Sequence, residues 1–162
     1  MLIFIVTFII SSLIFEYCIN EFKRQMKRQK YGINPMLIPK MDEVDHMKGK
    51  EFDEFVLTLF ENTGYRVELT PRNQGYGADL ILYEDKLKFA VQAKRYKNPV
   101  GVKAVEEVLR GMKYHKTNKA MVITNSTFTI SAYELARSKS VVLWDRKKLI
   151  KLMRRATRKV YY

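Results

Sequence analysis

Apolar and polar residues follow two different periods along this chain, and the two periods predict its helices and strands. Helices are predicted where apolar residues recur at helical spacing, over 42–62, 102–115, 129–138 and 146–159. Strands are predicted where short apolar runs lie between turn residues, over 66–70, 120–124 and 141–144. Asp42 or Asp45 is the expected cap of the first helix.

Residues 80–91 contain two apolar runs around a polar middle, which predicts a β-hairpin. Gln92 and Lys94 continue the second strand, and they project from the same side because side chains alternate along a strand. A hairpin of this length brings Asp79 beside them. We therefore expect a carboxylate, an amide and an ammonium group to converge at one sheet edge. Such a cluster suits holding a hard divalent cation against a phosphate.

Together these elements follow the order αβββαβαβα, which predicts an α/β fold with a mixed sheet flanked by helices. Residues 71–77 are predicted to form a loop that enters the site, because they contain polar residues and two glycines.

The N-terminus has no charged residue before Glu16, and apolar residues continue to Ile19. A spanning helix needs about 20 residues, with about 17 as the lower limit, so residues 1–20 predict a transmembrane anchor. A hydrophobic helix that packs on the domain or on a partner is the alternative. A secretory signal peptide is disfavoured, since no basic residues precede the apolar run and no small-residue cleavage site is present.

Residues 21–41 are interpreted as a basic juxtamembrane segment and linker, and residues 42–162 as the folded domain. Basic residues beside a span tend to stay in the cytoplasm. The prediction is therefore a single-pass protein of the cell membrane with its folded domain in the cytoplasm. The basic residues that support this orientation are Lys23, Arg24, Lys27, Arg28 and Lys30.

A net charge of +13 makes polyanions the expected partners, and both nucleic acid and anionic lipid qualify. Charge alone does not choose between them. Cys18 is the only cysteine, so no intramolecular disulfide can form. One cysteine and two histidines also disfavour a structural zinc site.

Asp79 followed by Gln92-Ala93-Lys94 resembles the signature of the PD-(D/E)XK nucleases, specifically the Mrr-like restriction endonuclease branch, in which Gln commonly takes the second acidic position. The similarity covers about residues 47–150. Further segments similar to the family are residues 49–56 with 64–65, 122–126, 128–129, 132–136, and 141–145 with 149.

The resemblance implies a Mg²⁺-dependent endodeoxyribonuclease acting in restriction or defence, with Mn²⁺ as a second usable metal. It assigns metal binding to Asp79, Gln92 and the backbone of Ala93, together with an acid of the first helix. The family usually has Glu directly after the helix Phe; here Asp53 holds that position, and Glu54 follows it. Which of the two acids serves stays open. Lys94 would polarise the attacking water or neutralise the transition-state phosphate.

Several polar residues near these motifs are candidate DNA contacts, with ordinary solvated side chains as the alternative: Arg72, Asn73, Gln74, Arg95, Tyr96, Lys97, Lys103, Asn125 and Ser126. The terminal helix is amphipathic and is expected to follow DNA backbone or to lie on a membrane. DNA, membrane lipid and a second copy in a homodimer are the expected partners. The alternative functions are a catalytically weak or inactive DNA-binding module of the same fold and a basic membrane-surface adaptor.

Overall fold

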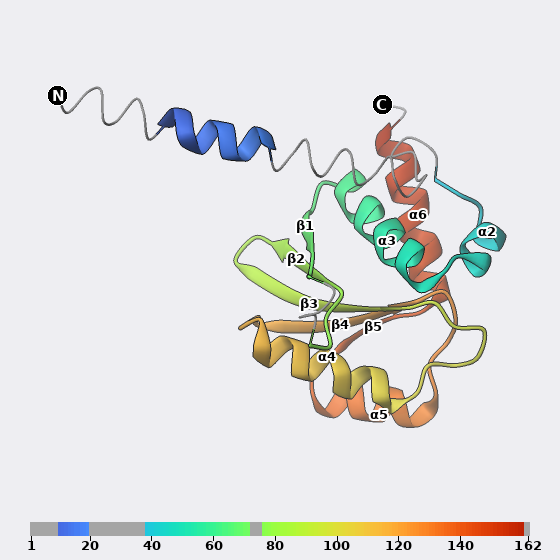
Figure 1. The fold of residues 1–162 in the computed structure, drawn as a ribbon. Helices are drawn as coiled ribbons and strands as arrows, with labels where there is room; N and C mark the ends of the chain where they lie inside the picture. The colour runs from blue at the N-terminus through green and yellow to red at the C-terminus, as the bar shows by residue number, and fades with distance from the viewer. Residues whose placement is uncertain (1–9, 20–37, 72–75, 161–162) are drawn as a thin grey trace. The chain divides into compact units, whose positions relative to one another are not determined.

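A five-stranded mixed sheet forms the centre of the folded domain in a computed structural model, which describes residues 10–19, 38–71 and 76–160 (Figure 1). The strands lie in the order β1-β2-β3-β4-β5. β1 to β3 are antiparallel, whereas β4 and β5 run parallel to β3. Their bounds are β1 Arg66–Leu69, β2 Leu80–Glu84, β3 Leu87–Lys94, β4 Lys119–Thr124 and β5 Val142–Trp144.

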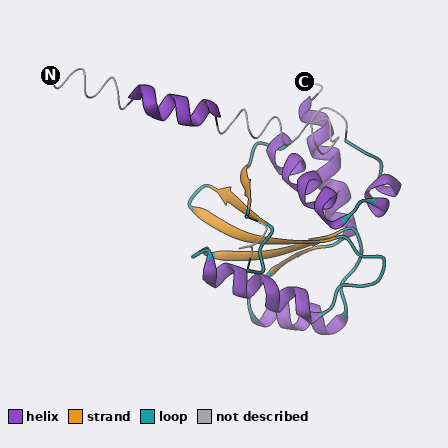
Figure 2. Ribbon diagram, in the orientation of Figure 1, coloured by secondary structure: helices purple, strands orange, loops and turns teal. Residues whose placement is uncertain are grey.

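Helices α3 and α6 cover one face of this sheet, and α4 and α5 cover the other (Figures 1 and 2). The bounds are α2 Met41–His46, α3 Gly49–Asn62, α4 Val102–Tyr114, α5 Ile130–Ser138 and α6 Arg146–Val160. The parallel connections β3–α4–β4 and β4–α5–β5 each cross over through a helix, as parallel strands require. The predicted mixed sheet flanked by helices is confirmed.

The predicted hairpin is formed by β2 and β3, which turn at Asp85-Lys86. Asp85 adopts a φ of 50°, a left-handed conformation that Asp tolerates better than most residues. Leu80 pairs with Val91, and the Asp79 amide donates to the Val91 carbonyl oxygen at 2.8 Å. The ladder therefore extends past β2 and holds Asp79 beside the end of β3.

The two faces of the sheet are packed with side chains of different sizes. Under α3 the core contains large rings, and Phe60 packs against Tyr65 and Trp144 with ring centroids 5.8 and 5.6 Å apart. Tyr65 and Trp144 are half-buried. The α4–α5 face has a core dominated by Ala and Val: Ala78, Ala90, Val100, Ala104, Val105, Val108, Ala120, Val122, Phe128, Ala132, Ala136, Val141 and Leu143.

The prediction of one helix over residues 42–62 is wrong, because the chain forms α2 and α3 with an extended break at Met47-Lys48. Neither predicted aspartate caps α3. Instead the Lys48 amide donates to Glu51 Oε2 at 2.7 Å, which satisfies a backbone donor at the start of the new helix. Asp45 is bound elsewhere, in an ion pair with Arg146.

The apolar side of α6 is part of the core, since α6 packs against α3 (Figure 1). The buried residues recur at helical spacing: Leu149, Leu152, Met153 and Ala156. The alternative in which this helix lies on a membrane through its apolar side is therefore wrong. Its exposed side carries Lys147, Lys151, Arg154 and Arg155.

The N-terminal unit, Met1–Asn34, has a helix over residues 10–19. Within the described ranges, no helix reaches the length and apolarity needed to cross a membrane. The transmembrane part of the fold prediction is thus unsupported by those ranges. Residues 1–9 of the predicted anchor, and residues 20–37 of the basic segment and linker, lie outside the described residues.

Candidate active site

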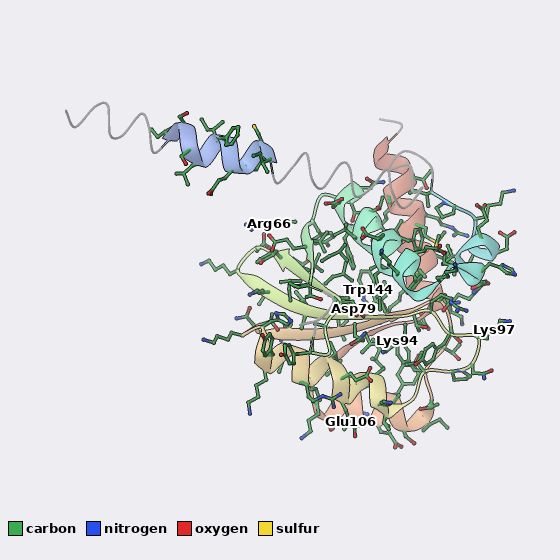
Figure 3. The ribbon with its side chains drawn as sticks, viewed as in Figure 1. Arg66, Asp79, Lys94, Lys97, Glu106 and Trp144 are labelled. Atoms are coloured by element: carbon green, nitrogen blue, oxygen red, sulfur yellow. The ribbon has the colours of Figure 1, made fainter. Side chains whose placement is uncertain are left out.

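Asp79 is held at the edge of the hairpin by two donors from β3. The Ala93 amide donates to Asp79 Oδ2 at 2.8 Å, and Gln92 Nε2 donates to the same oxygen. Within the described contacts, Asp79 Oδ1 has no hydrogen bond, so this oxygen remains available to a cation. Lys94 lies on the same side of β3 as Gln92, and its charge acts on Asp79. Figure 3 labels Asp79 and Lys94 near the middle of the domain.

The Gly77-Ala78 segment lets α4 pack directly against the chain that leads into Asp79. Gly77 has a φ of 98°, and a Cβ there would lie 1.9 Å from the carbonyl oxygen of Glu107. A Cβ on Gly111 would lie 2.8 Å from Ala78 Cβ. The two glycines thus permit a contact between helix and loop that any larger residue would prevent.

This close packing brings Glu107 of α4 to Lys94. Lys94 Nζ lies 2.7 Å from Glu107 Oε2, and each side chain is 19% exposed. Figure 3 labels the neighbouring Glu106, which is exposed on the outer side of α4. Sequence reasoning missed Glu107. One feature of the sequence could have indicated it. Glu107 lies four residues before Gly111, so the two share a face of the predicted helix, and that face is not the apolar one.

Asp53 of α3 interacts electrostatically with this cluster. Burial, followed by the charges of Asp79 and Glu54, raises the pKa of Asp53 to about 7, and the charge of Lys94 opposes the rise. Glu54 is 5% exposed. Burial also raises the pKa of Asp79, although the Ala93 amide and Lys94 lower it in part.

The donor set fits a hard divalent cation. Asp53 and Asp79 are both shielded from water and their negative charges repel each other, a cost that a bound cation would remove. No group of three or more His, Cys, Asp or Glu residues in the described ranges is arranged to hold a metal. The two carboxylates would therefore need Gln92, backbone oxygens and waters to complete the shell. Mg²⁺ usually keeps several waters.

Four of the candidate DNA-contacting residues line one cavity of about 370 Å³ beyond the ends of β3 and β4: Tyr96, Lys97, Asn125 and Ser126. Two of them take part in local structure. The Tyr96 amide donates to Asn125 Oδ1 at 2.8 Å, and Asn125 Nδ2 donates to Asp45 Oδ1 at 2.8 Å. Arg146 binds both oxygens of Asp45 at 2.7 and 2.8 Å, which lowers the pKa of that carboxyl. The side chain of Asn125 therefore already braces this loop.

Of the remaining candidate DNA contacts that the structure describes, Arg95 and Lys103 do not line that cavity. Arg95 is half-buried, and its Nε has no hydrogen bond among the described contacts. Lys103 is exposed on α4. Arg72, Asn73 and Gln74 fall in residues 72–75, outside the described residues.

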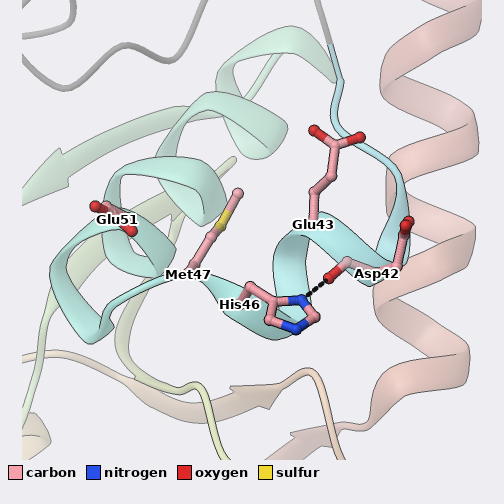
Figure 4. Close-up of a pocket in the computed structure, with 5 residues that line it drawn as sticks. All are labelled: Asp42, Glu43, His46, Met47 and Glu51. Atoms are coloured by element: carbon pink, nitrogen blue, oxygen red, sulfur yellow. Dashed lines mark hydrogen bonds between the residues drawn. The ribbon is translucent and has the colours of Figure 1, made fainter.

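A separate acidic cavity of about 390 Å³ lies beside α2 and the start of α3 (Figure 4). His46 there bonds through Nδ1 to the Asp42 carbonyl oxygen at 2.7 Å. Glu43, Met47 and Glu51 complete the lining, and Glu51 is committed to the Lys48 amide. None of the residues that line this cavity belongs to the Asp79 site.

A family model described as "Restriction endonuclease" (Mrr_cat) matches residues 44–153, about two thirds of the chain. The chain belongs to the Mrr-type restriction endonuclease family. Members are nucleases that act on DNA phosphodiester bonds, and such nucleases typically use divalent metals. The resemblance seen in the sequence is therefore confirmed. The matched span of this restriction endonuclease domain includes Asp53, Asp79, Gln92, Lys94 and Glu107.

The domain is also similar to individual proteins. The chain is 27% identical over 120 residues to the uncharacterized protein y4cE of Sinorhizobium fredii (strain NBRC 101917 / NGR234), covering 70% of this chain and 31% of that protein. It therefore spans about a third of the length of that curated relative.

Two solved structures have a similar fold. The DNA modification-dependent restriction endonuclease AspBHI has a TM-score of 0.56 and 24% identity, covering 75% of this chain and 37% of AspBHI. AF1548, a protein of unknown function, has a TM-score of 0.53 and 19% identity, covering 62% of each chain. At these identities the likeness shows a shared fold.

Proposed function

We propose that residues 42–162 form a Mg²⁺-dependent endodeoxyribonuclease that hydrolyses DNA phosphodiester bonds. The observation that carries the proposal is the meeting of Asp79, Gln92 and Lys94 at the end of the hairpin, within electrostatic reach of Asp53. Membership of the restriction endonuclease family supports the same reaction.

Asp79 would hold the metal through Oδ1, because its Oδ2 is fixed by Ala93 and Gln92. Asp53 would provide the second carboxylate, and the Gln92 amide and the Ala93 backbone carbonyl would provide neutral oxygens. Bound there, Mg²⁺ or Mn²⁺ would act as a Lewis acid on the phosphate and promote ionisation of the attacking water.

Lys94 places a positive charge beside this cluster, where negative charge develops on the phosphate as the bond breaks. An interaction that strengthens in the transition state raises the rate of the chemical step. Glu107 orients the Lys94 ammonium group through the contact at 2.7 Å. We assign Glu107 as a positioning residue, because its described contact is with Lys94.

Exposed basic residues give the domain a surface for DNA backbone. Lys97 lies after β3, Lys103 lies on α4, and the outer side of α6 adds Lys151, Arg154 and Arg155. With a net charge of +13, binding is expected to weaken steeply as salt rises. Arg72, Asn73 and Gln74, with Arg95, Tyr96, Asn125 and Ser126, remain proposed DNA contacts.

The proposed setting is the cytoplasmic face of the cell membrane, with residues 1–20 as a single-pass anchor. The uncharged run before Glu16 and the basic residues after it support this setting. Restriction or defence, including attack on modified DNA, is the proposed role, and a homodimer would let two sites cut both strands. The anchor proposal predicts that deleting residues 1–30 moves the protein from the membrane fraction to the soluble fraction. A soluble full-length protein would contradict it.

The test of the nuclease proposal is cleavage of plasmid DNA by wild type, Lys94→Ala and Lys86→Ala, each with Mg²⁺ and with EDTA. Lys86→Ala is a matched control, because it removes the same charge at the exposed hairpin turn. Wild type and Lys86→Ala should cleave in Mg²⁺ and not in EDTA, and Lys94→Ala should be at least about 100-fold slower. Equal cleavage by wild type and Lys94→Ala would overturn the proposed site.

A DNA-binding module without catalysis is the second candidate. The Lys94–Glu107 ion pair favours it, because it partly neutralises the charge that catalysis would use. Salt-sensitive binding of DNA by wild type, with no cleavage in either Mg²⁺ or Mn²⁺, would support this candidate over the nuclease.

A further inference from the structure

Two tyrosine rings are stacked on each other at the surface beside the active site. The ring centroids of Tyr76 and Tyr114 are 4.1 Å apart with an interplanar angle of 29°, and the residues are 55% and 50% exposed. His115 meets Tyr114 edge-on, with the centroids 5.0 Å apart. Aromatic rings usually contribute to stability through burial, so an exposed pair held in a fixed stack suggests a binding surface.

The pair borders a cavity of about 640 Å³ that also has two basic residues, Arg110 and Lys113. One face of α4 carries Glu107, Arg110 and Tyr114 at helical spacing. The guanidinium group of Arg110 and the ring of Tyr114 therefore lie on the same side of the helix. Glu107 is the acid in this lining, and it is paired with Lys94. The cavity therefore combines a stacking surface with positive charge, which suits a base and its phosphate.

This surface lies close to the proposed point of cleavage. Tyr76 precedes Asp79 by three residues, a separation of at most about 11 Å in an extended chain. Tyr114 lies seven residues after Glu107 on α4, or about 10 Å along the helix axis. About 10 Å corresponds to about three base steps along a DNA strand. Gly77 and Gly111 fix this spacing through the tight contact between loop and helix.

We propose that Tyr76 and Tyr114, with Arg110 and Lys113, bind an unpaired base of the DNA strand about three nucleotides from the cleavage site. The inference rests on the proposed nuclease function and names the DNA feature that the domain prefers. A base inside a duplex has both faces covered by its neighbours, whereas an unpaired or extruded base offers a free face for stacking. The preferred substrate is therefore DNA with a bulge, flap or frayed end.

The test measures affinity in EDTA for a duplex that contains one bulged 2-aminopurine and for the fully paired duplex of the same sequence. Wild type should bind the bulged DNA more tightly than the paired DNA. Binding should also quench the 2-aminopurine fluorescence, because stacking on an aromatic ring quenches this base. Tyr114→Ala and Tyr76→Asn should each weaken binding of the bulged DNA by about 5- to 150-fold, with binding of the paired DNA within about twofold. Asn suits position 76, where φ is 42°.

Two further variants keep the test specific. Tyr114→Phe keeps the ring and should retain the affinity for bulged DNA. Tyr133→Ala removes a tyrosine of similar exposure, 46%, from α5 and should leave both affinities unchanged. Equal affinity of wild type for the two DNAs, or an equal loss of both affinities in Tyr114→Ala, would overturn the inference.

Plasmid cleavage in Mg²⁺ by the same wild-type protein separates this inference from the proposed function. Cleavage of plasmid DNA without tighter binding of the bulged DNA would contradict the base-binding site and support the nuclease proposal. Tighter binding of the bulged DNA without cleavage of plasmid DNA would support the base-binding site and contradict the nuclease proposal.

Discussion

The two faces of the sheet are built on opposite packing principles. The face under α3 and α6 is filled with large rings, including the fully buried Phe52, Phe55 and Phe60. The face under α4 and α5 is filled mostly with Ala and Val, and two glycines let α4 reach the Gly77-Ala78 segment. The large rings bury more apolar area per residue, and the small residues let the backbone of α4 approach the Gly77-Ala78 segment closely.

This difference accounts for the form of the candidate site. Lys94 emerges on the side of β3 that faces α4, and Glu107 reaches it because no large side chain separates α4 from the loop before Asp79. We infer that the small-residue face positions Lys94 and Glu107, whereas the aromatic face, apart from Asp53 on α3, contributes mainly to stability. Substitutions on the two faces should therefore have separable effects.

The largest effect is expected from Gly77→Val. Its side chain would clash with the Glu107 backbone and would adopt an unfavourable positive φ, so α4 must move away from the loop. Cleavage of plasmid DNA should fall by at least about 100-fold, since misplacement by about 1 Å has that cost. Gly49→Ala is the control, because nothing lies within 4 Å of the added Cβ. Full activity in Gly77→Val would contradict the spacing argument.

Asp53→Asn should stabilise the protein at alkaline pH. Burial raises the pKa of Asp53 from 3.8 to about 7, so the folded state favours the protonated form, and stability from this group is lost as pH rises from about 4 to 7. The difference between the pKa values of Asp53 in the unfolded and folded states corresponds to a loss of folding free energy of about 4 kcal/mol, which solvent screening reduces to about 2 kcal/mol.

Thermal unfolding without metal at pH 4 and pH 8 measures this effect. The variant should have the higher melting temperature at pH 8, and the gap should shrink toward pH 4. Addition of Mg²⁺ should raise the melting temperature of wild type more than that of Asp53→Asn. A gap that does not change with pH would contradict the electrostatic coupling of Asp53 to the site.

Glu107→Gln should slow cleavage by about tenfold, because the neutral amide holds the Lys94 ammonium group less firmly. The loss should appear in kcat rather than KM, since Glu107 orients a group that acts in the chemical step. Glu106→Gln removes the same charge from the exposed side of α4 and should have no effect. An equal loss in both variants would indicate a general charge effect instead of positioning.

The smallest effect is expected from Phe60→Leu on the aromatic face. Loss of the ring contacts with Tyr65 and Trp144 should destabilise the domain by about 1 kcal/mol. Cleavage per folded molecule should stay within about twofold of wild type. Urea unfolding and the plasmid assay together measure the two quantities. A large loss of activity at unchanged stability would mean that the two faces do not act separately.

Local sequence patterns predicted most of the fold. The hairpin was predictable because its apolar runs and polar turn are contiguous, and the same pattern predicted that Asp79 lies beside Gln92. The break between α2 and α3 was not predictable from periodicity, because Glu51 makes a local cap with Lys48 inside an uninterrupted helical pattern.

Two features of the site depend on contacts between residues distant in sequence. Glu107 reaches Lys94 only after α4 has packed on the Gly77-Ala78 segment, so its role cannot be seen in the helix pattern. The electrostatic interaction of Asp53 with Asp79 also forms across the fold, so the helix pattern alone could not reveal it. Asn125 stays a predicted DNA contact, and the hydrogen bonds of its amide with Tyr96 and Asp45 could not be seen in the sequence.

The central claim is that Asp79 helps to hold a divalent cation that the reaction needs. Plasmid cleavage by wild type and Asp79→Asn across a Mg²⁺ titration tests it most directly, because Asn keeps the shape and removes the charge. We predict metal-dependent cleavage by wild type and a loss of at least about 100-fold in Asp79→Asn that added Mg²⁺ does not restore. Equal cleavage by both proteins, or wild-type cleavage that persists in EDTA, would contradict the account.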